Sequence, residues 1–232
     1  MLKLPRPSII VFDLDNTLYD YDQPNTFATQ ILIEKISSQA SIETVEVKSA
    51  LEASRLNVKQ RLGETASSHS RLLYIAEVYR LLSLNPVVEQ FLNLEKLFWD
   101  SYLSQMQLFP GVNEFIQLLK KRDIPLALVT DLTSNIQYQK LMKLELDSCF
   151  DFILTSEEAG GDKSSGIPFR LLSQVCSDPL SSAWFVGDGE FDHPANEICE
   201  AIFIRKINSL KSTGNSDELI FQHFDELMTL LD

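Results

Sequence analysis

Cysteine is scarce in this sequence. Only three occur among 232 residues, at Cys149, Cys176 and Cys199, and no pair has the spacing of a Cys-x-x-Cys motif. An odd number of distant cysteines favours neither a disulfide framework nor a zinc site. We therefore expect reduced thiols in the core, and stability from a hydrophobic interior that a chain of this length can bury.

Positive charge is also in short supply. The 20 Lys and Arg residues are outnumbered by 33 Asp and Glu residues, which gives a formal net charge of -13. Such a surface repels phosphate backbones and anionic lipid headgroups, so we expect neither nucleic acid nor a membrane as a partner. A small anionic substrate would need a local cation, supplied by Lys, Arg or a metal ion.

Long hydrophobic runs are absent as well. No stretch approaches the roughly 20 apolar residues that span a bilayer, and the apolar run near the first residue is too short for a signal peptide. We predict a cytoplasmic protein. The 44% hydrophobic and 23% charged residues are typical of an ordinary globular fold.

Short apolar runs alternate with segments of helical periodicity. Four near-continuous runs are rich in β-branched and aromatic residues, and a fifth run is weaker. In chain order they cover residues 8–12, 124–129, 152–154, 183–186 and 201–204. Runs of this kind are typical of strands buried on both faces, which predicts an α/β fold with a parallel sheet.

An insertion of about 90 residues separates the first two predicted strands, far more than such connections usually need. Apolar residues recur within it at helical spacing, with almost no strand pattern. These helical segments cover residues 27–36, 45–56, 72–82 and 87–103. We predict an all-helical cap domain of residues 20–108, inserted into an α/β core of residues 1–19 and 109–232.

Acidic side chains follow three of the predicted strands. Catalytic groups of an open parallel sheet gather at the carboxyl ends of its strands, so these side chains should lie together. The residues concerned are Asp13, Asp15, Thr130, Asp131, Asp188 and Asp192. Crowded carboxylates repel one another unless they share protons or bind a hard cation.

A magnesium ion accounts best for this cluster. Mg²⁺ takes one or two protein carboxylates and keeps several waters, so Asp13 and Asp188 would suffice as ligands. Lys163, after the third strand, would supply the local cation. A calcium loop is excluded because Leu18 and Pro24 stand where its glycine and glutamate belong. A simple capping turn would explain one aspartate, but not acids at three strand ends.

Four segments, in order along the chain, resemble the four motifs of the haloacid dehalogenase superfamily. VFDLDNTLYD is similar to the first motif, LALVTD to the second and FVGDGEFDHPAN to the fourth, while Lys163 stands where the third has its lysine. The helical insertion is similar in place and size to the cap of the phosphoglycolate-phosphatase-like subgroup. The resemblance implies a Rossmann-like core and a Mg²⁺-dependent phosphatase that hydrolyses a small phosphorylated metabolite.

The resemblance also implies a role for each catalytic residue. Asp13 would attack phosphorus and form an aspartyl phosphate. Asp15 would protonate the leaving oxygen and then take a proton from the hydrolytic water. Thr130 would hydrogen-bond the phosphoryl group, and Lys163 would stabilise its charge.

The same resemblance implies the metal ligands. Asp13, the backbone carbonyl of Asp15 and Asp188 would hold Mg²⁺, and Asp192 would steady the site directly or through water. Dehalogenases and phosphonate hydrolases of this superfamily lack an acid two residues after the nucleophile, so Asp15 argues for phosphoryl chemistry and against dehalogenation and C-P cleavage. Ser164 replaces the proline that usually follows the third-motif lysine.

Two alternatives stay open at this level. A phosphomutase of the same superfamily uses the same two aspartates, and a catalytically silent member would act as a binding or interaction module. Silent members are expected to lose the nucleophile or the metal acid, whereas Asp13 and Asp188 are both present.

The helical insertion contains one polar and aromatic stretch, RLGETASSHSRLLY. Within it, Arg71 is the best candidate for substrate binding because a guanidinium can grip a second phosphate or a carboxylate bidentately. His69 is the other candidate. The alternative for each residue is a place on a solvated helix face.

Overall fold

The computed structural model describes residues 4–194, 201–207 and 219–231 of the chain. The chain divides into two compact units, one formed by residues 1–20 and 107–232 and the other by residues 21–106.

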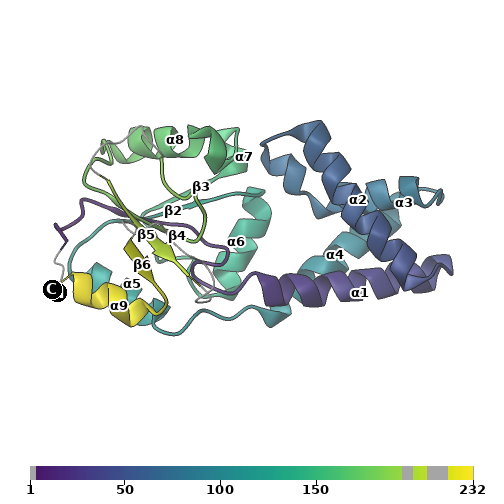
Figure 1. Ribbon diagram of the computed structural model, residues 1–232, viewed down its shortest axis with the longest axis horizontal. Coiled ribbons are helices and arrows are strands. Elements are labelled where there is room, and N and C mark those ends of the chain that lie inside the picture. Colours follow the sequence, from purple (N-terminus) through teal and green to yellow (C-terminus); the bar gives the residue numbers. More distant parts are fainter. Residues whose placement is uncertain (1–3, 195–200, 208–218, 232) are drawn as a thin grey trace. The chain divides into compact units, whose positions relative to one another are not determined.

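The first unit is built on a six-stranded sheet with the order β3-β2-β1-β4-β5-β6 (Figure 1). The strands are β1 (Ile10–Phe12), β2 (Leu126–Thr130), β3 (Phe152–Thr155), β4 (Trp184–Gly187), β5 (Ile202–Lys206) and β6 (Leu219–Phe221). All neighbours pair in parallel. The predicted α/β class is therefore confirmed, and β1 to β5 overlap the five predicted strands. β6 was not predicted.

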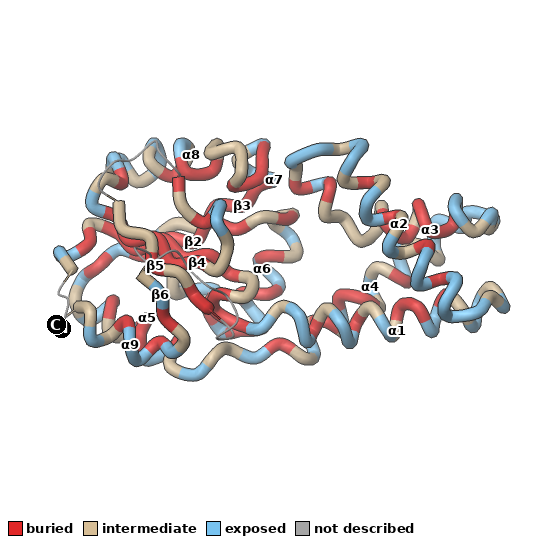
Figure 2. The backbone as a smooth tube through the Cα atoms, viewed as in Figure 1, coloured by how far each residue is buried: buried red, intermediate tan, exposed pale blue. Residues whose placement is uncertain are grey.

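Helices cover both faces of this sheet. They are α5 (Val112–Lys121), α6 (Ser134–Lys143), α7 (Ser156–Ala159), α8 (Ile167–Cys176) and α9 (Phe224–Leu230). On one face, Val11 and Phe185 pack in a buried cluster with Phe169 of α8. Because side chains alternate along a strand, Phe12 faces the other way, where its ring meets Phe115 of α5. The central strands β1, β2 and β4 are accordingly buried on both faces (Figure 2).

Helices are the regular secondary structure of the second unit in its described residues. Its helices are α1 (Asp22–Ala40), α2 (Thr44–Leu62), α3 (Arg71–Leu81) and α4 (Val88–Gln105), with a 3₁₀ turn, η1 (Ala66–His69). They overlap the four predicted helical segments. Gly63 ends α2 with a positive φ of 65°, which suits a residue without a Cβ. The Ser70 side chain caps α3 by accepting a hydrogen bond from the Leu73 amide at 3.3 Å.

The cysteines correct one expectation. Cys149 and Cys176 are free thiols, as predicted. Both are partly exposed, however, so the prediction that they lie in the core was wrong. Cys176 packs only at the edge of the buried cluster beside α8. Cys199 lies outside the described residues.

In the described part of the chain, every helix is too short or too polar to cross a membrane.

Candidate active site

The side chain of Asp13 is fixed at the point where the sheet reverses its strand order. Asp13 directly follows β1, and its amide donates to the carbonyl of Val186 in β4 at 2.9 Å. Only 6% of its surface is exposed. The Lys163 ammonium donates to Oδ1 at 2.6 Å and the Thr17 hydroxyl donates to Oδ2 at 3.0 Å. Both carboxylate oxygens therefore have fixed directions.

Three carboxylates converge at this place. Asp13, Asp188 and Asp192 each offer an oxygen, and these atoms all lie within 4.8 Å of one another. Asp192 is held by Lys163 and by the amide of Gly189, which donates to its Oδ2 at 2.6 Å. A side chain at Gly187 would overlap Asp192, so the close approach of this carboxylate to β4 requires glycine there.

The electrostatics of the cluster favour a further cation. Burial and the charge of Asp192 raise the pKa of Asp13, and the same two causes raise the pKa of Asp188 to about 6. Burial alone would lower the pKa of Lys163, but the carboxylates of Asp13 and Asp192 outweigh it and raise that pKa. One ammonium therefore faces three carboxylates. Oxygen donors with excess negative charge fit a hard divalent cation.

Thr130 and Asp131, at the end of β2, are also brought to this site. Gln137 of α6 donates from Nε2 to the Thr130 hydroxyl oxygen at 2.6 Å, which leaves the hydroxyl proton available to another acceptor. Asp131 Oδ1 accepts the Lys163 amide at 2.9 Å. Asp131 thus anchors the backbone from which Lys163 reaches Asp13.

Asp15 is paired with a lysine that the sequence analysis missed. Lys140 of α6 is completely buried, and its ammonium lies 2.8 Å from Oδ1 and 2.9 Å from Oδ2 of Asp15. The Tyr19 hydroxyl also donates to Oδ1. By contrast, 27% of the Asp15 side chain is exposed. The cation is thus buried more deeply than its carboxylate.

The buried face of α6 explains why these residues were overlooked. Gln137 and Lys140 are three residues apart and share this face with Leu141. Because two of the three residues are polar, the helix lacks the apolar period that reveals a buried face. Thr17 was missed for another reason: it lies within the segment VFDLDNTLYD, but no role was assigned to it.

The two insertion candidates lie in the helical unit. Arg71 donates to the Tyr21 hydroxyl at 2.7 Å, to Asn25 Oδ1 at 3.2 Å and to the carbonyl of His69 at 3.0 Å. Arg71 also lines a pocket, whereas His69 does not. Arg61, from the same polar stretch, pairs instead with the buried Glu77 at 3.4 Å.

Fold and site together define an α/β protein with a carboxylate cluster and a buried ammonium at the reversal of a parallel sheet. Residues 10–198 match the family of haloacid dehalogenase-like hydrolases, and the chain belongs to this family. The predicted family and the predicted hydrolase class are thereby confirmed.

Curated relatives within the family are phosphatases. The chain is 33% identical over 180 residues to the ribulose-1,5-bisphosphate 5-phosphatase of Halopiger xanaduensis, covering 77% of this chain and 75% of the relative. It is 23% identical over 193 residues to the phosphoglycolate phosphatase of Nitrosococcus oceani, covering 82% and 79%.

A solved structure agrees in fold. The HAD-hydrolase YfnB from Bacillus subtilis, bound to magnesium, matches with a TM-score of 0.68 at 17% sequence identity. The match covers 98% of this chain and 100% of that one.

Proposed function

We propose that this protein is a Mg²⁺-dependent phosphatase that hydrolyses a small phosphomonoester through an aspartyl phosphate on Asp13. One observation carries the proposal: a buried aspartate at the sheet reversal has one oxygen held by Lys163 and the other by Thr17. A carboxylate with fixed oxygens is oriented for in-line attack on phosphorus. Relatives of this chain are phosphatases.

In the first step, Asp13 attacks and the bond from phosphorus to the leaving oxygen breaks. Asp15 donates a proton to that oxygen, so that an alcohol departs instead of an alkoxide. The Thr130 hydroxyl donates to a phosphoryl oxygen, since Gln137 already occupies its acceptor side. Lys163 offsets the charge that develops on the phosphoryl group.

In the second step, water attacks the phosphorus of the aspartyl phosphate. Asp15, now a carboxylate, accepts a proton from this water, and the carboxylate of Asp13 is released with inorganic phosphate. The same side chain thus serves as acid and then as base.

Mg²⁺ fits the oxygen donors of Asp13, Asp188 and the Asp15 backbone carbonyl, and bound there it would neutralise charge on the phosphoryl oxygens. Asp192 accepts hydrogen bonds from Lys163 and from the Gly189 amide. We propose that it steadies the site directly or through water, as the motif resemblance implies. The B. subtilis HAD-hydrolase, which has a similar fold, was solved bound to magnesium, and this supports the choice of Mg²⁺ as the metal.

The substrate is proposed to carry a second acidic group. Ribulose-1,5-bisphosphate and phosphoglycolate, from which the two relatives take their names, each contain one. Arg71 is the proposed contact for this group. His69 stays a proposal with weaker support, because its hydrogen bond with Arg71 uses the backbone carbonyl of His69 and not the imidazole. The helical unit as a cap domain that closes during turnover is likewise a proposal.

First-turnover measurements on two variants test the catalytic assignments. Asp13→Asn removes the attacking oxygen, so no burst of product should appear with any phosphomonoester. Asp15→Asn keeps the nucleophile, so p-nitrophenyl phosphate should still give a burst, whereas ethyl phosphate, with its poor leaving group, should not. A burst from Asp13→Asn, or equal losses on both substrates for Asp15→Asn, would refute these roles.

The two alternatives are separated by product analysis. Phosphate release from a panel of phosphomonoesters supports the phosphatase. Isomerisation of hexose phosphates without net release would establish a phosphomutase, and no reaction with any substrate in Mg²⁺ would favour a silent member.

A further inference from the structure

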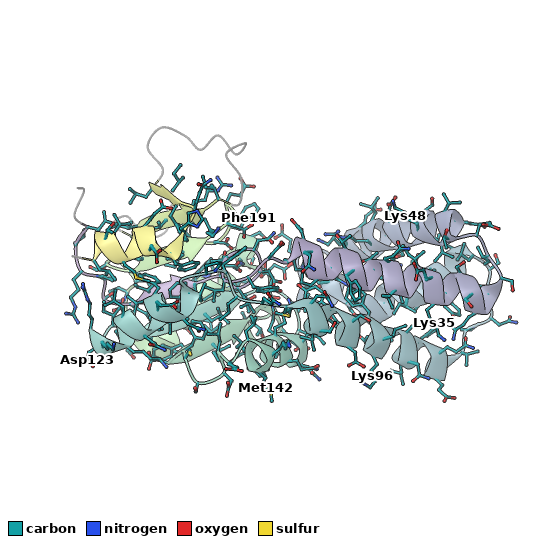
Figure 3. All side chains as sticks on the ribbon, turned by 90° about the horizontal axis from the view of Figure 1, so that it is seen from below. Lys35, Lys48, Lys96, Asp123, Met142 and Phe191 are labelled. Carbon is teal, nitrogen blue, oxygen red and sulfur yellow. The ribbon has the colours of Figure 1, made fainter. Side chains whose placement is uncertain are left out.

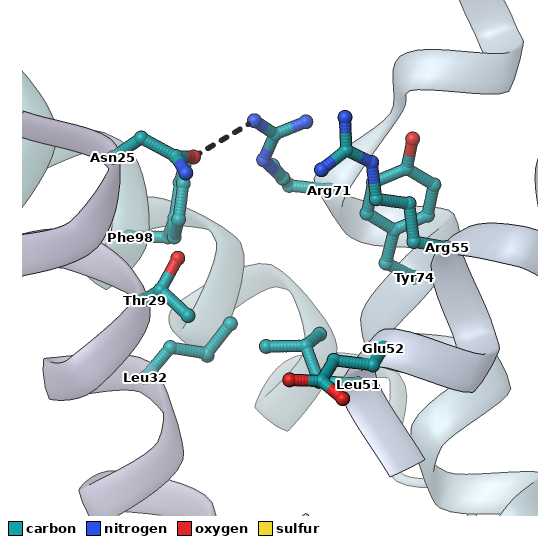
Figure 4. A pocket seen from close by; sticks show the side chains of 9 residues that line it. All are labelled: Asn25, Thr29, Leu32, Leu51, Glu52, Arg55, Arg71, Tyr74 and Phe98. Atoms are coloured by element: carbon teal, nitrogen blue, oxygen red, sulfur yellow. Dashed lines mark hydrogen bonds between the residues drawn. The ribbon is translucent and has the colours of Figure 1, made fainter. Parts of the chain in front are cut away.

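A small pocket lies inside the helical unit, where α1, α2, α3 and α4 meet (Figure 4). Its volume is about 140 Å³, below the range of roughly 300–1,000 Å³ that holds drug-sized ligands. It therefore suits a small ligand or one end of a larger one. Arg55 of α2 and Arg71 of α3 both line it, and Figure 4 shows their guanidinium groups at the same end.

The Arg71 guanidinium is held rigidly by groups without charge. Its carbon lies 5.5 Å from the ring of Tyr74, 5.0 Å from that of Phe98 and 5.4 Å from that of Trp99. Its hydrogen bonds all end on neutral oxygens, those of Tyr21, Asn25 and His69. Stacking and hydrogen bonds together fix the cation in one orientation.

This arrangement lacks the expected counter-ion. Among the described residues, the ion pairs include no partner for Arg71 or Arg55. Arg71 is also the first residue of α3, where the helix dipole disfavours positive charge. Glu52 is the one carboxylate in the lining, and Figure 4 shows it at the opposite end from the two guanidinium groups. In a chain of net charge -13, two cations in one pocket are a specific feature.

We infer that this pocket binds a phosphate or carboxylate group, with Arg71 as the oriented donor and Arg55 as a second cation. Arg71 retains donor hydrogens beyond the three that are engaged, and a planar guanidinium matches such oxyanions. Two sources carry the same chemistry: a second acidic group on the substrate, which rests on the proposed function, or a separate small anion.

Binding is tested by thermal unfolding in chelator with inorganic phosphate, against chloride at equal ionic strength. Removing metal leaves the carboxylate cluster of the other unit negative, so phosphate binding reports on the pocket. Wild type and Lys48→Gln, a control at an exposed site on α2, should both be stabilised (Figure 3). Arg55→Gln, which alters an exposed side chain and spares the core, should lose most of that shift. No stabilisation of wild type, or equal shifts in all three proteins, overturns the inference.

The source is identified by comparing 2-phosphoglycolate with ethyl phosphate, which differ by one carboxylate. If the substrate supplies the anion, Arg55→Gln should raise KM for phosphoglycolate roughly three- to tenfold, and Arg71→Gln roughly ten- to a hundredfold. Both changes should raise KM for ethyl phosphate much less, because ethyl phosphate lacks the carboxylate. If the variants keep the wild-type KM for phosphoglycolate but lose the thermal stabilisation by phosphate, the pocket binds a separate anion. If no substrate is hydrolysed, the proposed phosphatase function is refuted. The inference about the pocket is unaffected, because the binding experiment needs no turnover.

The contact between the Lys140 ammonium and both carboxylate oxygens of Asp15 supports a second, independent inference. The geometry points to Lys140 as a positioning residue that holds the Asp15 carboxylate for proton transfer, an inference that rests on the proposed acid and base role of Asp15. Its ammonium reaches both oxygens, at 2.8 and 2.9 Å, from a fully buried position on α6. A carboxylate held at both oxygens cannot rotate, which preserves the geometry that proton transfer needs.

Leaving-group dependence separates positioning from a structural role. Lys140→Met should slow the first turnover of ethyl phosphate by roughly tenfold or more and affect p-nitrophenyl phosphate much less, with KM unchanged. Lys140→Arg should restore part of the ethyl phosphate rate, and Lys143→Met, at an exposed site on α6, should match wild type. Equal losses on both substrates refute the positioning role, provided that Asp15→Asn still discriminates between them. If Asp15→Asn does not discriminate, the proposed role of Asp15 fails first.

Discussion

Replacing Asp15 by asparagine should destabilise this protein more than replacing Lys140 by methionine, although each change breaks the same ion pair. The two side chains differ in burial: Lys140 is fully enclosed, whereas 27% of Asp15 is exposed. Asp15→Asn removes the carboxylate that lies against a fully enclosed ammonium. Lys140→Met removes the buried charge. The remaining Asp15 carboxylate can still be hydrated and can still accept the hydrogen bond of the Tyr19 hydroxyl.

The magnitudes follow from this difference. Breaking a buried pair by removing one partner costs about 3–5 kcal/mol when the remaining charge is enclosed. Losing hydrogen bonds to a carboxylate that stays partly hydrated should cost about 1–2 kcal/mol. Asp15→Asn also removes the repulsion between Asp15 and Asp13. Of the charged groups that shift the pKa of Asp13, Asp15 has the smallest effect, so losing this repulsion offsets little of the destabilisation.

The assay is urea unfolding of both single variants and of the double variant, in one buffer. The double variant should be more stable than Asp15→Asn alone, because the buried ammonium is removed together with its carboxylate. If Lys140→Met proves the more destabilising single change, or if the two losses simply add, the argument from unequal burial is wrong.

Three further outcomes are expected. Activity should require Mg²⁺, vanish in chelator and be suppressed by Ca²⁺, which prefers a looser and higher coordination; full activity in chelator would rule out the metal. The pKa of Asp188, about 6, exceeds the unfolded value of about 4, so this group contributes stability at low pH that is lost as the pH rises from 4 to 6. In chelator, the free energy of unfolding of Asp188→Asn, measured with urea, should therefore rise by about 2–3 kcal/mol relative to that of wild type between about pH 4 and pH 6. Parallel plots of unfolding free energy against pH for the two proteins would contradict this. Gly187→Ala should displace Asp192 and lower kcat at least tenfold while the circular dichroism spectrum is kept; wild-type kinetics would show that Asp192 can move without cost.

The motifs were readable from the sequence because their chemistry is local. Asp13 and Asp188 directly follow apolar runs of strand character, and the carboxyl ends of parallel strands meet at one edge. β6, by contrast, is only three residues long and partly exposed, so it lacks the continuous apolar run that revealed the other strands. The domain boundaries and the residue roles at the site stay predictions.

By itself, the sequence determined the class of the protein, the order of its strands along the chain and the aspartates at their ends, because these depend on periodicity and on spacing within short segments. Lys163 was expected at this site from the motif resemblance, but only the tertiary structure decided that Lys140 serves Asp15. Lys140 lies 125 residues from Asp15 in the sequence. No local pattern relates residues so distant, and a lysine on a buried helix face looks solvated until the packing around it is known.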